Sequence, residues 1–183
     1  MLKYFPNIRI FLNGVVIVFS VLICILLLPA RLPGMELLGI NPHWLLIWVV
    51  AWSVKRTSLE GAIAGLILGL IQDGMTGGHP THIFGLILVG IITSRIQKEK
   101  YIKEDFVSVA LIVFAMVILT ETITAIQYMF QGLRNFSDIW LHHQKVALAS
   151  AILSSLWTPV LYYPLNYWWS KLEKFKKGSF RIN

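Results

Sequence analysis

The sequence predicts an all-α integral membrane protein: a single polytopic domain over residues 1–183, built as a compact bundle of six transmembrane helices. Two observations lead to this prediction, the composition and the recurrence of long apolar segments. Of the 183 residues, 56% are hydrophobic and 14% are charged, against about 45–50% and about 25% in a typical soluble domain. The mean hydropathy of +0.69 and the single cysteine exclude a disordered chain, a disulfide scaffold and an ordinary soluble enzyme.

Six apolar segments are candidates for membrane spans, because a bilayer core of about 30 Å needs about 20 apolar residues in a helix. In chain order they cover residues 10–28, 37–54, 59–73, 81–96, 106–130 and 145–169. The first ends at Pro29 and is longer than the apolar part of a signal peptide, which predicts an uncleaved anchor. The second opens at Pro42 or, with an earlier start, near Leu37.

The later segments differ in length and in what interrupts them. The third and fourth are short and contain glycines, so they are either spans shielded by neighbouring helices or a helical hairpin that does not cross fully. The fifth is mostly apolar, and Glu121 lies near its middle between threonines. The sixth ends on Trp168 and Trp169 ahead of Lys171, an aromatic and basic boundary typical of a membrane interface. Residues 170–183 are then predicted to form a basic cytoplasmic tail.

The placement of Lys and Arg predicts the orientation of these segments, because cytoplasmic loops carry an excess of basic residues. Thirteen of the 16 basic residues fall in the two tails and in the second–third and fourth–fifth connections. The other three, Arg31, Arg134 and Lys145, fall on the opposite side. Both termini are therefore expected in the cytoplasm. This bias, together with attraction to anionic lipids, explains the net charge of +7 better than nucleic-acid binding does.

Small residues form two regular stripes that predict close helix packing. In the third segment they are Gly61, Gly65 and Gly69, at four-residue intervals on one helical ridge. In the sixth segment they are Ala147, Ala151 and Ser155. Such ridges let helix backbones approach closely in lipid, so each stripe is expected to pack within the bundle or, as the alternative, to meet a partner.

Two acids stand out by position. Asp73 continues the glycine spacing to the end of the third segment, where it faces the negative end of the helix dipole and needs a compensating hydroxyl or turn amide. It either stops the helix in an Asx-type turn or serves as a docking or ion-coupling carboxylate. Glu121 lies near the middle of the fifth segment, and an acid at that depth is a candidate for function. Gln127, six residues on, lies about 240° round the helix and is not expected to share its face.

The sequence predicts no catalytic, cofactor or metal site. His79 and His82 form one close pair of histidines and His142 and His143 another, and neither comes with a matching set of cysteines or carboxylates. The second pair is predicted to lie in an outside loop before the sixth segment. The serines of the sixth segment have no base placed to activate them, so they are expected to pack rather than react.

Several motifs in order point to one family. The motif residues are Pro42 and Trp44 at the start of the second span, Asp73 and Gly77 at the end of the third, and Trp157 and Pro159 in the last. Together they resemble the rod-shape-determining protein MreD family, over essentially the whole chain and most sharply over residues 42–86. After the glycine turn the family often has Leu-Gly where this chain has Pro80-Thr81, a departure that would alter a docking surface there.

This resemblance implies a fold similar to the membrane-embedded substrate-binding subunits of energy-coupling-factor vitamin transporters. It implies a multi-pass protein of the bacterial cytoplasmic (inner) membrane that acts without catalysis or cofactor, as a scaffold and regulator of cell elongation. The implied partners are an MreC-like membrane protein, the glycosyltransferase and transpeptidase pair that builds lateral peptidoglycan, and MreB indirectly.

The residues themselves leave two other classes open. One is a substrate-capture subunit of a vitamin-type transporter, in which Asp73, Glu121 and the histidines would line a pocket. A small molecule retained through purification would identify it. The other is an intramembrane hydrolase, which predicts that alanine in place of one serine and one histidine abolishes activity.

Overall fold

The structure, a computed structural model, describes residues 6–30, 34–78, 80–98, 106–131 and 136–179. Within these ranges the chain forms six α-helices and no β-strand, which confirms the all-α class. Three helices contain apolar stretches long enough to cross a membrane: Ile10–Leu27, Val107–Gln131 and His143–Leu172. They correspond to the first, fifth and sixth predicted spans. The middle three predicted spans correspond to helices that are shorter or less apolar.

Helix α1 (Pro6–Leu27) is the least buried of the three long apolar helices. Its exposed side chains are apolar, as at Phe11, Val18 and Phe19. The helix packs mainly on α2, where the indole Nε1 of Trp48 donates a hydrogen bond to the Ser20 hydroxyl at 2.8 Å. One polar contact thus anchors a helix whose remaining surface suits lipid.

A tight turn separates α1 from α2, so the predicted start of the second span near Leu37 was wrong. Leu37 and Ile40 exchange both backbone hydrogen bonds at 3.0 Å. The two residues between them, Leu38 and Gly39, have φ values of 56° and 77°. Positive φ at both central residues is what a type I′ turn requires. Helix α2 (Trp44–Ser53) begins only after this turn and the Pro42 that follows it.

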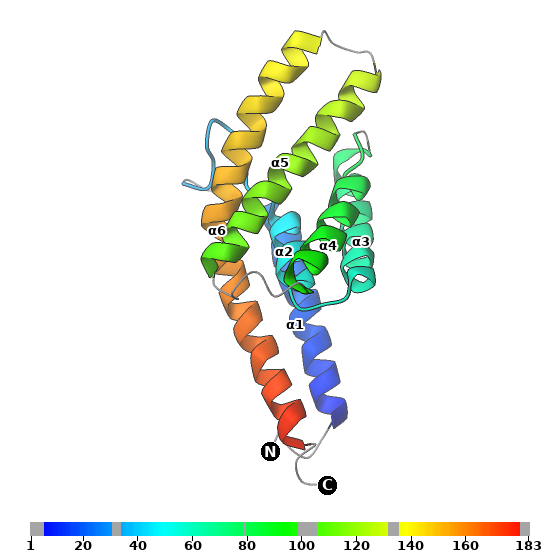
Figure 1. The fold of residues 1–183 in the computed structure, drawn as a ribbon, viewed down its shortest axis with the longest axis vertical. Coiled ribbons are helices and arrows are strands. Elements are labelled where there is room, and N and C mark those ends of the chain that lie inside the picture. The colour runs from blue at the N-terminus through cyan, green and yellow to red at the C-terminus, as the bar shows by residue number, and fades with distance from the viewer. Residues whose placement is uncertain (1–5, 31–33, 79, 99–105, 132–135, 180–183) are drawn as a thin grey trace.

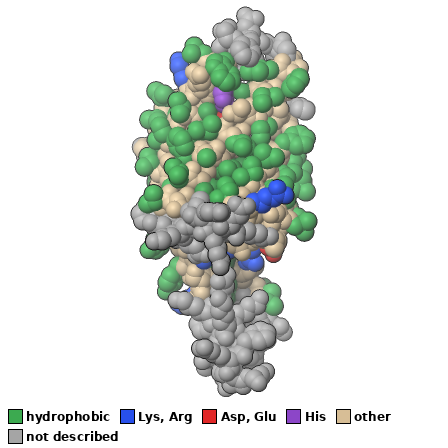
Figure 2. Space-filling model, in the orientation of Figure 1, with side chains coloured by type: hydrophobic (Ala, Val, Ile, Leu, Met, Phe, Trp, Pro, Cys, Tyr) green, Lys and Arg blue, Asp and Glu red, His purple; other side chains and the backbone are tan. Residues whose placement is uncertain are grey.

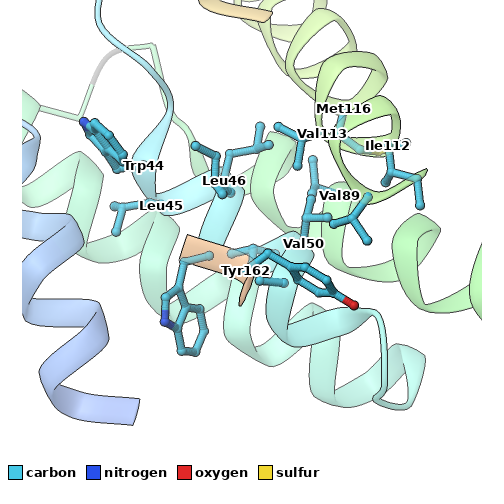
Figure 3. Packing of buried hydrophobic residues seen from close by; sticks show 14 of the residues in the cluster. Trp44, Leu45, Leu46, Val50, Val89, Ile112, Val113, Met116 and Tyr162 are labelled. Atoms are coloured by element: carbon cyan, nitrogen blue, oxygen red, sulfur yellow. The ribbon is translucent and has the colours of Figure 1, made fainter. Parts of the chain in front are cut away.

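Helix α2 is the centre of the bundle. It has 10 residues, of which nine are buried, and it contacts every other helix. A helix of this length covers about 15 Å, half of a bilayer core. Figure 3 shows its side chains Leu46 and Val50 meeting Val89 of α4 and Val113 of α5. This enclosure explains why α2 is apolar on all sides.

Helices α3 (Ser58–Thr76) and α4 (Ile83–Lys98) form an antiparallel hairpin. A capping box starts α3: the Thr57 side chain accepts from the Glu60 N–H, and the Glu60 carboxylate accepts from the Thr57 N–H at 2.9 Å. Gly77, with φ of 88°, ends it in a left-handed C-cap. An antiparallel pair fits both predicted arrangements, two full spans and a hairpin that does not cross fully, so the extent of crossing stays a prediction.

Helices α5 (Phe106–Gln131) and α6 (Phe136–Ser179) pair along most of α5. At 44 residues α6 is much longer than the predicted span of 145–169. It continues at both ends, so His143 lies in the helix and not in the predicted outside loop. Two internal prolines, Pro159 and Pro164, do not end it.

The two ends of the molecule differ. The start of α1 and the end of α6 project together at one end, and the paired α5 and α6 project at the other, with α2, α3 and α4 between them (Figure 1). Hydrophobic side chains cover most of the described surface in Figure 2, and the visible Lys and Arg side chains lie toward the ends of that region. The visible face is therefore mainly apolar, as expected of a surface that faces lipid.

Candidate functional site

Glu121, the acid predicted to be deep in the membrane, pairs with a histidine. Its Oε1 lies 2.6 Å from His43 Nε2, and the two side chains are only 13% and 19% exposed. The backbone N–H of His43 also donates to the Ser154 hydroxyl of α6 at 2.9 Å. The residue just before α2 is therefore joined to α5 through its side chain and to α6 through its backbone.

Asp73 bridges the reversal between α3 and α4. Its Oδ2 accepts from the Thr81 hydroxyl at 2.5 Å. Its Oδ1 accepts from the His82 N–H at 2.7 Å and lies 2.8 Å from His82 Nδ1. The compensating hydroxyl expected for this acid is present, and the amide is that of His82, just before α4, rather than one from the glycine turn. Since Asp73 is 11% exposed, these contacts replace most of its hydration.

Gln127 extends this second cluster to α5. Its side-chain oxygen accepts from the Thr81 N–H at 2.9 Å, and its nitrogen donates to the Thr81 carbonyl at 3.0 Å. Thr81 is thus held by α3 and α5 together. Gln127 and Glu121 have different partners, in line with their predicted angular separation.

One histidine contacts Glu121 and two more described histidines interact with it over a longer distance. His43 touches it, and His82 and His143 are near enough to act on it electrostatically. Within the described ranges no three His, Cys, Asp or Glu side chains are arranged to hold a metal ion. His79 and the side chain of His142 lie outside what the structure describes. Sequence reasoning missed His43 as the partner of Glu121, because 78 residues separate them and no local pattern links such positions.

The glycine stripe of α3 packs against α4. A methyl group at Gly61 would lie 2.5 Å from the Gly90 carbonyl oxygen, and one at Gly69 would lie 2.7 Å from the Ile83 Cα. One at Gly65 would overlap the Leu86 carbonyl group. Helix backbones are therefore in direct contact along the whole ridge, which is the close approach that such ridges allow.

The small residues of α6 divide between two environments. Ala147 and Ala151 are buried, and the Ser150 hydroxyl donates to the Asn41 carbonyl at 3.4 Å. Ser154 is fully buried, whereas Ser155 is half-buried and donates to the Ile152 carbonyl of its own helix at 2.8 Å. The buried stripe therefore runs through Ser154, the residue that meets the backbone N–H of His43.

The motif residues Trp44, Trp157, Pro42, Gly77 and Pro159 lie on three parts of the fold. Trp44 at the start of α2 meets Trp157 of α6 edge to face, with ring centroids 5.6 Å apart. Pro42 is buried just before α2, Gly77 caps α3, and Pro159 lies inside α6. The tryptophans that lie deep in their segments are therefore packing residues.

Replacing Thr81 by valine is expected to loosen the junction of α3, α4 and α5. The change removes the hydroxyl bonded to Asp73 and keeps the volume and the two backbone contacts with Gln127. Loss of the charge-assisted hydrogen bond to Asp73, and of the weaker one that the hydroxyl accepts from the Ile83 N–H at 3.3 Å, should lower the unfolding free energy by about 2 kcal/mol. Thermal unfolding in detergent measures this. Thr81→Ser keeps the hydroxyl and should stay near the parent stability, so an equal loss in both variants would contradict the assignment.

Comparison with known proteins gives one family. No curated protein and no solved structure matches the chain significantly, so the expected likeness to energy-coupling-factor subunits stays a prediction. The family model described as rod shape-determining protein MreD matches residues 9–167, which include parts or all of the six helices. The description of the family implies a role in rod shape determination, and the family is not a known enzyme family. A match of this extent places the chain in the MreD family.

Proposed function

We propose that this protein is a multi-pass scaffold of the bacterial inner membrane that binds an MreC-like partner and helps regulate lateral peptidoglycan synthesis. The observation that carries the proposal is the MreD family match, which implies a role in rod shape determination. The glycosyltransferase and transpeptidase pair would be reached through that partner, and MreB indirectly.

The arrangement of polar groups supports a structural role. Glu121 and Asp73, the two acids singled out from the sequence, each contact a histidine, and Thr81 and Gln127 complete the second cluster. These contacts join α2 to α5 and the α3–α4 hairpin to α5. A polar interior satisfied in this way favours one fixed packing of the helices, as a scaffold needs.

The orientation we propose places both termini in the cytoplasm, with six helices in the membrane. The start of α1 and the end of α6 lie at the same end of the molecule (Figure 1), and the sequence next to these two helix ends is rich in Lys and Arg, as a cytoplasmic face requires. α2 is enclosed by the other helices and so meets little lipid. Enclosure lets such a short helix stay at membrane depth without crossing alone.

A depletion and co-purification experiment tests this function. In a rod-shaped bacterium depleted of its own MreD, expression of this chain should restore rods, and the chain should co-purify with the MreC counterpart of its own source in mild detergent. Round cells together with no co-purification would refute the proposal. A small molecule retained through purification, with uptake once an ATPase module is supplied, would refute it in favour of the transporter.

A further inference from the structure

Two side-chain oxygen atoms in the α1–α2 connection are buried without a hydrogen bond. They are Oε1 of Glu36 and Oδ1 of Asn41, and no described residue donates to either atom. A buried acceptor that has lost water without gaining a donor raises the free energy of the folded state. In native proteins such an atom calls for an explanation, of which a bound ion is one. The two oxygens therefore point to a bound species.

The tight turn holds these two residues opposite each other. The Leu37 N–H donates to the Ile40 carbonyl at 3.0 Å, within an antiparallel bridge. The two peptide groups in this bond begin at Glu36 and end at Asn41, so the Cα atoms of these two residues flank it. Residues placed in this way lie about 4.5–5.5 Å apart and direct their side chains to the same face. The carboxylate and the amide are therefore neighbours.

The backbone on the Asn41 side of the turn is fixed against α6. The connection runs beside α6 (Figure 1), and the Asn41 carbonyl accepts from the Ser150 hydroxyl at 3.4 Å. Two residues on, the His43 N–H donates to the Ser154 hydroxyl at 2.9 Å. The backbone of Asn41 is thus held while its side-chain oxygen stays unpaired. Glu36 is only half-buried, so water can reach the rest of its carboxylate.

We infer that Glu36 and Asn41 bind a hard divalent cation, for which Ca²⁺ is the best fit. Both atoms are acceptors, and one belongs to a carboxylate. Ca²⁺ accepts carboxylate and amide oxygens in flexible geometry and completes its shell with water, whereas Mg²⁺ demands a near-ideal octahedron. A cation, unlike a water molecule, also neutralises the charge of Glu36. In the orientation proposed above, the connection lies on the side away from the cytoplasm.

Thermal unfolding of the full-length protein in neutral detergent, after treatment with a chelator, tests the site. With so little ligand charge we expect a dissociation constant of about 1 mM. Calcium chloride at about 10 mM should then raise the melting temperature by about 3–6 °C over potassium chloride of equal ionic strength. Glu36→Gln keeps the shape without the charge and should abolish the rise. Asn41→Asp adds a second carboxylate and should about double it, as tenfold tighter binding would.

A matched control separates this site from general charge effects. Glu60→Gln removes the same charge from the exposed first turn of α3, keeps a residue type suited to its capping box, and should keep the rise. Each variant is compared with itself in the two salts, so a change in its basal stability does not affect the result. No rise in the parent protein, or an equal rise in Glu36→Gln, would overturn the inference. An unchanged elution volume establishes that each variant is folded.

Discussion

Alanine at Gly65 is expected to push α3 away from α4 and to destabilise the whole protein. The added methyl group would lie 2.7 Å from the backbone nitrogen of Ile87 and closer still to the Leu86 carbonyl. Backbone atoms cannot rotate aside as a flexible side chain can, so the helices must separate. Overpacking of this kind costs about 2–3 kcal/mol, which corresponds to a fall of about 5–10 °C in the melting temperature of a chain this size.

Gly74 provides the control for this prediction on the same helix. It also lies within α3, but a methyl group there would meet nothing within 4 Å. Gly74→Ala should therefore leave the melting temperature unchanged or raise it slightly, because alanine loses less conformational entropy in a helix. If both variants melted alike, close contact between α3 and α4 would not be what Gly65 provides. Thermal unfolding in detergent, followed by tryptophan fluorescence, measures both.

Removing the carboxylate of Glu121 is the second change with a large expected effect. Glu121→Ala leaves the imidazole of His43 without its partner in a site where the two side chains are 13% and 19% exposed. Breaking a buried pair by removing one member costs about 3 kcal/mol. His43→Ala should cost a similar amount, since the partner left behind is then the acid.

A double-mutant cycle shows whether these two losses share one cause. If the contact at 2.6 Å accounts for them, Glu121→Ala/His43→Ala should cost only about 1 kcal/mol more than either single change, which is a coupling of about 2 kcal/mol. Additive losses would mean that the pair does not interact. Glu121→Gln keeps an oxygen acceptor for the histidine and should cost less than Glu121→Ala.

Local periodicity predicted much of the fold. The four-residue glycine spacing in α3 indicated a close helix contact, and the structure shows α4 on that ridge. The long apolar runs predicted α1, α5 and the middle of α6. These features depend on residues a few positions apart, so they can be read from one chain.

Features that depend on distant residues could not be predicted. His43 meets Glu121 and Ser154 at separations of 78 and 111 residues, and no local pattern encodes those meetings. The helix ends also depended on more than apolar content. α6 continues through the polar residues before Lys145, and the apolar Leu37 lies in a turn that Gly39 allows.

The central position of α2 has a consequence for how the chain is made. This helix is the second to be synthesised, yet His43, the residue just before it, contacts Ser154 of α6 and Glu121 of α5. Ten residues are too few to hold a helix across a bilayer alone. We therefore expect α2 to reach its final place only after the last helix has been inserted, so that a nascent chain stopped before Phe136 remains open to degradation by membrane proteases.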